Sequence, residues 1–223
     1  MAEITITGGT GYIGRALIGR LVGAGHTVTA LARTASRHNV SSGARIVEGS
    51  ALKADDVSRA LTDRCTLVLL VGTPHPNPSK ARQFNEVDLE SVKAAAKAIR
   101  RGAVAHVVYV SVAHPAPVMK AYIAVRTEGE RLLKETGVPL TVLRPWYVLG
   151  PGHWWPLALI PFYKLFEQLP STRDTALRLG LVTHAQMVSA LASAAAGGEP
   201  RNFRVIDVPE IRGARSGSKT VAL

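Results

Sequence analysis

The sequence contains a single cysteine, Cys65, among its 223 residues. One thiol cannot form an intramolecular disulfide, and it does not suffice for a cysteine-based metal site. Because Cys65 stands just before the apolar run 67–71, we expect it to be a buried core thiol. Such sparse use of cysteine is typical of a reducing compartment, and a cytoplasmic location is therefore expected.

Long hydrophobic runs are also lacking. The first apolar run, 4–6, is too short for a signal peptide and is followed at once by glycines. The longest uncharged stretch, 145–163, approaches a membrane span in length but contains four prolines and His153. Because proline breaks helices, we expect no transmembrane segment here and interpret the stretch as a pocket wall or an interfacial lid.

Acidic residues are scarce, since 16 Asp and Glu stand against 27 Lys and Arg, and the formal net charge is +11. A large positive net charge can favour binding to nucleic acid or to an anionic membrane surface. The basic residues are scattered, however, and in 118–136 they share a helical segment with glutamates. No stripe of basic and aromatic residues resembles a surface that binds single-stranded nucleic acid. A phosphate-rich small ligand and a solvated basic surface explain the charge better than nucleic acid. The histidines show no metal-ligand spacing, and no metal is expected.

Short apolar, β-branched runs alternate with helical patterns along the chain. Strands are predicted at 4–7, 27–32, 45–48, 67–71, 105–110, 140–143 and 203–208. Helices are predicted at 11–24, 55–63, 80–101 and 118–136, and a late helix is predicted with Thr183 as N-cap and Gln186 in a capping box. Near-continuously apolar strands separated by helices indicate a parallel sheet covered on both faces. We therefore predict an α/β fold: a Rossmann-type doubly wound parallel sheet in a single domain.

A glycine-rich turn connects the first predicted strand to the first predicted helix. It reads Thr-Gly-Gly-Thr-Gly-Tyr-Ile-Gly over 7–14. Residues without Cβ let backbone amides approach a pyrophosphate at the helix N-terminus. Glycines can also serve a tight turn for steric reasons alone, but at the first β/α turn of a doubly wound pattern they favour dinucleotide binding. The residues expected at the cofactor here are Gly8, Thr10, Gly11, Tyr12, Ile13 and Gly14.

The end of the second strand distinguishes the two nicotinamide dinucleotides. An acidic residue about 20 positions beyond the glycines would accept the ribose hydroxyls of NAD. The stretch 31–37 has no carboxylate, but it contains Arg33 and Arg37. Two arginines can hold a 2′-phosphate by charge-assisted hydrogen bonds, so NADP(H) is expected in preference to NAD(H). The alternative is that both are solvated surface arginines.

With the glycine turn, Arg33 and the strand order in view, the chain resembles the short-chain dehydrogenase/reductase superfamily. More narrowly, it is similar to the atypical, NmrA-like NAD(P)H-binding members, which include the small flavin and biliverdin reductases. The resemblance covers most of 3–150 and rests further on segments 47–52, 69–73, 108–111, 130–137 and 143–145. We expect an NAD(P)-binding domain over 1–211, in which the irregular segment 145–180 forms the substrate side. The tail at 212–223 is rich in Gly, Ser, Arg and Lys and is expected to be flexible.

The resemblance also implies positions around the cofactor. Ser50 and Ala51 would lie beside the adenine, although the family usually has aspartate where Ser50 stands. Gly72 and Thr73 would pass under the cofactor, and Pro145 and Trp146 would border its nicotinamide end. The residues of 145–156 contain three tryptophans, which would either stack on a planar acceptor or pack as an ordinary satellite core. His153 in this segment is a candidate proton donor or a structural residue.

The catalytic signature departs from the family pattern. Active members carry tyrosine followed four residues later by lysine, whereas this chain has Tyr122 and Arg126. Positions four apart face the same way on a helix, so both side chains can meet one cofactor. Ser111 matches the first residue of the usual Ser-Ser pair, and Val112 occupies the second, catalytic place. Tyr122 is therefore a proton donor, a ligand contact, or a residue of the helix's apolar face, in a stripe that includes Val118, Tyr122, Val125 and Leu132.

Two functions remain open at this point. The first is an NADPH-dependent oxidoreductase that reduces a small planar or carbonyl acceptor such as a quinone or flavin, with Tyr122, Ser111 and Arg126 as the catalytic candidates. Flavin-reductase relatives lack the tyrosine–lysine pair and rely on placing the nicotinamide against the acceptor. The second is a non-catalytic NADP(H)-binding redox sensor or assembly subunit. An epimerase or dehydratase of the same superfamily is disfavoured, because those enzymes normally carry a larger C-terminal substrate domain than the residues after 150 can form. The oligomeric state is open.

Overall fold

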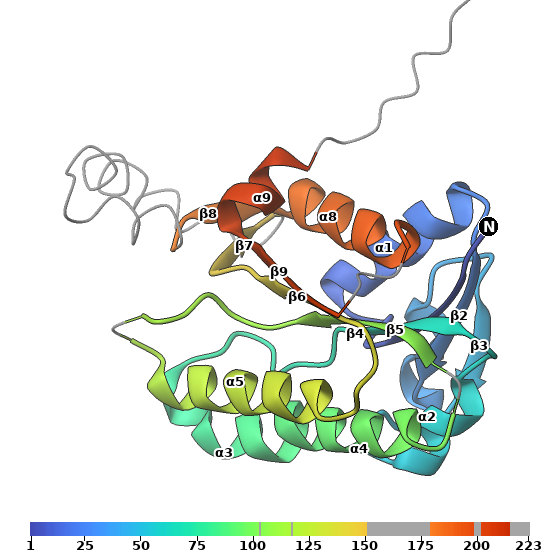
Figure 1. Cartoon of the computed structure of the whole chain (residues 1–223), viewed down its shortest axis with the longest axis horizontal. Coiled ribbons are helices and arrows are strands. Elements are labelled where there is room, and N and C mark those ends of the chain that lie inside the picture. The colour runs from blue at the N-terminus through green and yellow to red at the C-terminus, as the bar shows by residue number, and fades with distance from the viewer. Residues whose placement is uncertain (103, 117, 151–178, 199–201, 215–223) are drawn as a thin grey trace, which may run out of the picture.

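Seven parallel strands form the central sheet of the computed structural model, which describes residues 1–102, 104–116, 118–150, 179–198 and 202–214 (Figure 1). Their order is β3-β2-β1-β4-β5-β6-β9. The strands are β1 (Glu3–Thr7), β2 (Thr27–Ala32), β3 (Arg45–Glu48), β4 (Cys65–Leu69), β5 (Val104–Val110), β6 (Leu140–Arg144) and β9 (Phe203–Asp207). All seven were expected from the sequence, with β4 two residues earlier than predicted. The doubly wound Rossmann-type single domain is confirmed.

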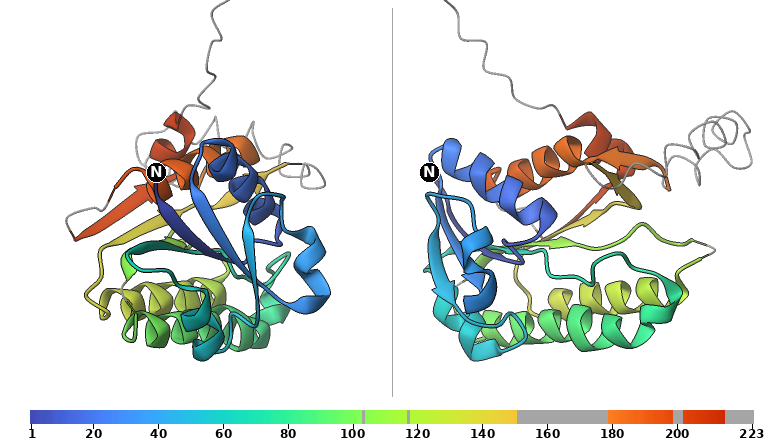
Figure 2. Two further views of the ribbon diagram at one scale, coloured as in Figure 1. Left: turned by 90° about the vertical axis from the view of Figure 1, so that its right-hand side faces the viewer. Right: turned by 180° about the vertical axis from the view of Figure 1, so that it is seen from behind.

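Helices cover both faces of the sheet, as Figure 2 shows from two further directions. On one face α1 (Tyr12–Gly23) packs against α8 (His184–Ala196), and α9 (Val208–Gly213) contacts α8. On the other face α4 (Glu90–Ile99) lies between α2 (Ala54–Ala60) and α5 (Lys120–Lys134). No helix in the described parts of the chain has the length and hydropathy needed to cross a membrane.

The two hydrophobic layers follow from the alternation of side chains along the strands. Val68 and Val108 belong to the cluster under α1 and α8, whereas Leu67 and Val107 belong to the cluster under α4 and α5. Because successive side chains point to opposite faces and both faces are covered, the central strands β4, β5 and β6 are largely apolar, whereas the edge strands β3 and β9 are largely exposed. Cys65 is fully buried in the second cluster, which confirms it as a core thiol.

The helix predicted at 80–101 is not uniform. A 3-10 turn (η2, Pro78–Lys80) and one α-helical turn (α3, Ala81–Gln83) precede a π-helical stretch (η3, Phe84–Leu89), which continues into α4. Within η3, Phe84 and Asp88 are both fully buried. Local π geometry inside a helix often marks a functional position. Here it accompanies a buried carboxylate.

The capping box at the start of α8 is confirmed. The backbone N–H of Gln186 donates to Thr183 Oγ1 at 3.2 Å, and the backbone N–H of Thr183 donates to Gln186 Oε1 at 2.8 Å. Sequence patterns missed a two-stranded parallel sheet of β7 (Tyr147–Leu149) and β8 (Leu181–Thr183), the 3-10 segment η1 (Thr34–Asn39), and α9. Strands of three residues are too short to show a period. The predicted tail at 212–223 begins within α9, and 215–223 lie outside the described residues.

Candidate functional site

The turn between β1 and α1 can only be built with glycine at position 8. Gly8 has φ +78°, and a Cβ there would lie 2.7 Å from the carbonyl carbon of Leu70. The N-cap of α1 is Gly11, which has no side chain to cap the helix, and the first turn contains no acidic residue. The first amides of a helix lack intrahelical acceptors and carry partial positive charge. This bend is therefore not closed by a capping side chain of its own, and it fits the pyrophosphate of a dinucleotide.

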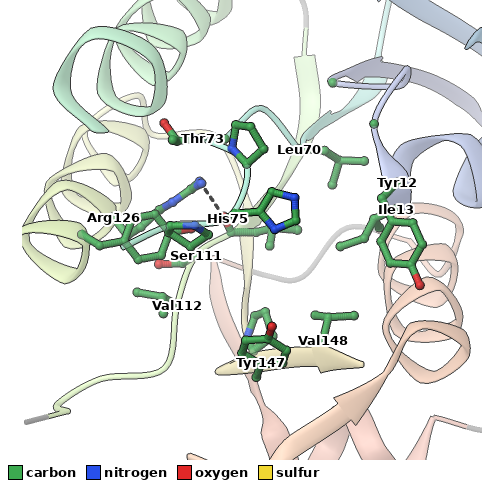
Figure 3. Close-up of a pocket in the computed structure, with 18 of the residues that line it drawn as sticks. Tyr12, Ile13, Leu70, Thr73, His75, Ser111, Val112, Arg126, Tyr147 and Val148 are labelled. Carbon is green, nitrogen blue, oxygen red and sulfur yellow. Dashed lines mark hydrogen bonds between the residues drawn. The ribbon is translucent and has the colours of Figure 1, made fainter. Parts of the chain in front are cut away.

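Two cavities of about 430 Å³ each open at the carboxyl ends of the strands, one on either side of this bend. They share the lining residues Gly8, Gly11, Leu70, Gly72 and Pro74. One extends toward the end of β2, and we call it the adenosine-side cavity. The other extends toward the ends of β5 and β6, and we call it the acceptor-side cavity (Figure 3). Ligands of open α/β sheets bind in this crevice beyond the strand ends.

Of the two arginines proposed from the sequence, Arg33 lines the adenosine-side cavity and Arg37 does not. The cavity is lined by Thr10, Arg33, Ser36, Ser50 and Ala51, among others. Arg37 is not among the lining residues, because its guanidinium pairs with Glu48 at the end of β3. Thr34 Oγ1 donates to the other carboxylate oxygen of Glu48 at 2.7 Å. The hydrogen bonds from Thr34 and Arg37 lower the pKa of Glu48, so the carboxylate stays ionised and retains Arg37.

The acceptor-side cavity brings together most of the remaining candidates. Its lining includes Tyr12, Ile13, Gly14, Gly72, Thr73, Ser111, Tyr122, Arg126, Pro145 and Trp146. Sequence reasoning did not single out His75, which also lines this cavity and points into it (Figure 3). Residues 151–156, including His153 and two of the tryptophans, lie outside the described residues. In the described residues, no cluster of three His, Cys, Asp or Glu could hold a metal ion.

Arg126 is buried, with its guanidinium bonded to groups of the protein. Its Nη2 donates to Asp88 Oδ1 at 2.6 Å, and its Nη1 donates to the Val110 carbonyl at 3.1 Å. The guanidinium also lies 5.1 Å from the centre of the Tyr122 ring. Burial alone would lower the pKa of Arg126, but Tyr122, Tyr109 and Asp88 raise it above its ordinary value. The group therefore keeps its charge and cannot take the place of a titrating lysine.

Asp88 was missed by sequence reasoning, yet it joins two parts of the site. Its Oδ2 accepts from the Thr73 amide at 3.0 Å and from Thr73 Oγ1 at 2.6 Å, while Oδ1 accepts from Arg126. The segment after β4 is thereby held against α5. A Cβ at Gly72 would lie too close to Arg126 Nη2, so a side chain there would displace the guanidinium from its present position.

Ser111 belongs to a second buried network. Its Oγ donates to Glu130 Oε1 at 2.6 Å, and Arg144 Nη2 donates to Glu130 Oε2 at 2.5 Å. Glu130 was also missed, although its position carried a signal. Tyr122, Arg126 and Glu130 follow one another at intervals of four on α5, which places two charged residues on the face of a predicted apolar stripe.

Tyr122 lies partly buried in the first turn of α5. The centre of its ring is 4.9 Å from the centre of the Phe84 ring. The face of the Tyr122 ring is turned toward the Arg126 guanidinium. Val118, which was assigned to the same apolar stripe, is 55% exposed and precedes the helix, so that assignment was wrong. The ring of Tyr122 thus packs on the protein and also lines the cavity, and its part in any proton transfer stays a prediction.

A family model described as NAD(P)H-binding matches residues 8–150, which span the bend and both cavities. The chain belongs to the NAD(P)H-binding family. This agrees with the resemblance to the short-chain dehydrogenase/reductase superfamily and its NmrA-like members that the sequence suggested.

A curated relative from Streptomyces griseus, named (4-alkanoyl-5-oxo-2,5-dihydrofuran-3-yl)methyl phosphate reductase, is 34% identical over 145 residues. The match covers 64% of this chain and 46% of the relative, so the chain spans about half the length of that protein. Among solved structures, a UDP-N-acetylglucosamine 4-epimerase from Bacillus cereus is similar with a TM-score of 0.68 and 14% identity, over 93% of this chain and 78% of that one.

The Bordetella bronchiseptica enzyme WbmG in complex with NAD is similar with a TM-score of 0.64 and 19% identity, over 92% of this chain and 72% of that one. At these identities the two structures show a common fold and nothing about substrate.

Proposed function

We propose that the chain is an NADPH-dependent oxidoreductase that reduces a small planar or carbonyl acceptor. The observation that carries this proposal is the pair of cavities that meet at Gly8 and Gly11, one lined by Arg33 and the other by Tyr122. When bound, NADPH would supply a hydride to the acceptor. The chain would hold the pyrophosphate at the start of α1 and place the acceptor between α5 and the segment after β6.

The preference for NADPH over NADH rests on Arg33. This arginine lines the adenosine-side cavity, and in the described residues no ion pair involves it. Arg37, in contrast, has its charge balanced by Glu48. A guanidinium that lines the cavity can form charge-assisted hydrogen bonds with a 2′-phosphate. We therefore assign the phosphate contact to Arg33, helped by Ser36.

A planar acceptor is supported by the apolar walls of the acceptor-side cavity, which include Val112, Trp146 and Val148. The Streptomyces relative is named as a reductase of a dihydrofuranone that carries an alkanoyl group. A conjugated ring of that kind is compatible with the apolar part of this wall. Because the relative is about twice as long, its substrate is not transferred to this chain.

A non-catalytic redox sensor is the second candidate, and the commitment of Arg126 to Asp88 favours it. With lysine replaced by a buried arginine, the chain lacks the usual partner for a catalytic tyrosine. Such a protein would bind NADPH and signal its presence without turnover.

Steady-state oxidation of NADPH against a panel of quinones, flavins and aldehydes separates the two candidates. The oxidoreductase proposal expects turnover with at least one planar acceptor and a higher rate with NADPH than with NADH. Tight NADPH binding without turnover of any acceptor would favour the sensor. A matched control is the Arg33→Ala variant, which should lower the rate with NADPH and leave the rate with NADH unchanged.

A further inference from the structure

Ser111 lines the acceptor-side cavity, is 3% exposed and already donates its hydroxyl proton to Glu130. A serine hydroxyl has one proton to donate and two lone pairs that accept. The proton of Ser111 is used, because Oγ lies 2.6 Å from Glu130 Oε1 and a carboxylate only accepts. Whatever meets Ser111 from the cavity therefore has to bring its own N–H or O–H.

Glu130 is held in this orientation by Arg144. Arg144 donates to both carboxylate oxygens, from Nε to Oε1 at 3.1 Å and from Nη2 to Oε2 at 2.5 Å. The side chain of Glu130 is 7% exposed, so water does not compete for its oxygens. The paired carboxylate stays in place and keeps the Ser111 proton directed away from the cavity.

The cavity wall around Ser111 is apolar in large part, although Thr73, His75 and Tyr122 also line it. Its chain neighbour Val112 and the apolar Val110 line the same cavity. Arg126 uses Nη1 and Nη2 on backbone carbonyls and on Asp88, while its buried Nε has no hydrogen-bond partner in the described residues. Figure 3 shows Ser111 beside Arg126 and Val112 on one wall of the cavity. A ligand that lacks a donor would leave the Ser111 oxygen unpaired in a largely apolar slot, which is costly.

We propose that Ser111, positioned by Glu130 and Arg144, selects acceptors that present an N–H or O–H group in the plane of a flat ring. The inference rests on the proposed function, since it names the class of acceptor for the same site. It differs from the usual expectation for a serine near a nicotinamide, which is to donate to a carbonyl oxygen. Ser111 is thus a specificity-determining residue, and Glu130 is a positioning residue.

The test compares lumiflavin with 3-methyllumiflavin, in which a methyl group replaces the ring N–H. Binding of each flavin to the protein loaded with NADP⁺ is measured by fluorescence titration, so that no turnover is needed. The wild-type protein should bind lumiflavin about tenfold more tightly, the value of one hydrogen bond to a neutral group. In Ser111→Ala the two flavins should bind equally, with the affinity for NADP⁺ unchanged. Ser41→Ala, outside both cavities, serves as the matched control and should keep the wild-type preference.

Glu130→Gln tests the positioning step. A glutamine amide can donate to Ser111, which would release the hydroxyl proton toward the cavity and reduce the preference for lumiflavin. Thermal unfolding of each variant checks that selectivity, rather than folding, has changed.

Equal binding of both flavins to the wild-type protein, a preference that survives in Ser111→Ala, or no binding of either flavin would overturn the inference. So would a loss of NADP⁺ affinity in Ser111→Ala without a change in flavin selectivity, which would assign the serine to the cofactor. These outcomes are distinct from failure of the proposed function, which is the absence of NADPH oxidation with every acceptor.

Discussion

Arg126 Nη2 donates to Asp88 Oδ1 at 2.6 Å, and the two side chains are 5% and 0% exposed. This ion pair connects α5 to η3, and through Thr73 it also holds the segment that follows β4. Arg126 is therefore a buried cation whose charge is balanced within the protein by Asp88. The consequences for stability, binding and catalysis can be measured separately.

Removing the carboxylate in Asp88→Ala should destabilise the fold by about 3–5 kcal/mol, because it leaves the buried Arg126 charge without a partner. The control is Glu86→Ala, which breaks an exposed pair with Arg82 whose side chains are 87% and 55% exposed. That change should cost less than about 1 kcal/mol. Urea denaturation measures both, and similar losses in the two variants would contradict the role assigned to Asp88.

Arg33→Ala should weaken NADPH binding by about tenfold or more, since charged hydrogen bonds to phosphate contribute about 1.5–3 kcal/mol. NADH affinity should hardly change. In Arg37→Ala the affinity for NADPH should stay within about threefold of wild type, because this guanidinium pairs with Glu48. Titration calorimetry with both dinucleotides checks the pair of variants. Equal losses for NADPH and NADH in Arg33→Ala would remove the 2′-phosphate assignment.

Tyr122→Phe should affect carbonyl and quinone or flavin acceptors differently. Reduction of a carbonyl needs a proton on the oxygen, so kcat for an aldehyde should fall by about a hundredfold, the usual contribution of a general acid. The rate with a quinone or flavin should remain within about twofold, because the ring still packs on Phe84 and lines the cavity. Unchanged kcat for an aldehyde would show that Tyr122 is only a packing or contact residue.

The buried His106 should make the free energy of unfolding depend on pH. It is 1% exposed, its Nε2 lies 2.9 Å from Thr141 Oγ1, and burial lowers its pKa to about 4. The unfolded state takes up the proton near pH 6.5 and the folded state only near pH 4, so stability is lost as the pH falls between these values. The loss should be on the order of 3 kcal/mol.

The His106→Gln variant keeps a hydrogen-bonding group for Thr141 but does not titrate. Its unfolding free energy should therefore change less than that of the wild-type protein between pH 6.5 and pH 4. Denaturant curves at several pH values give the two slopes. The same slope in both proteins would mean that other groups cause the acid sensitivity.

The central strands were predictable because they are buried on both faces and are therefore largely apolar, as in 67–69 and 107–109. The bend at Gly8 and the Thr183 capping box were predictable because a turn or a cap depends on a few adjacent residues. β7 and β8 were not, since each has three residues and pairs with a segment distant in the chain.

The buried polar networks were the main omission. Asp88 lies within a π-helical stretch, where a regular helical period gives the wrong face, and its partners are Thr73 and Arg126. Glu130 follows Arg126 by one helical turn, so its burial was visible in the spacing on α5, but its contact with Ser111 depends on the packing of β5 against α5. The sequence alone could not decide between Arg33 and Arg37 as the phosphate ligand. The ion pair of Arg37 with Glu48, seen only in the structure, favours Arg33.

Titration calorimetry of the wild-type protein with NADPH tests most directly whether the bend between β1 and α1 binds a dinucleotide. One NADPH should bind per chain, Gly8→Ala should abolish the binding heat, and Gly19→Ala, whose added Cβ meets nothing within 4 Å, should retain it. A wild-type protein that takes up neither NADPH nor NADH, or a Gly8→Ala variant that folds and binds as tightly as wild type, would contradict the account.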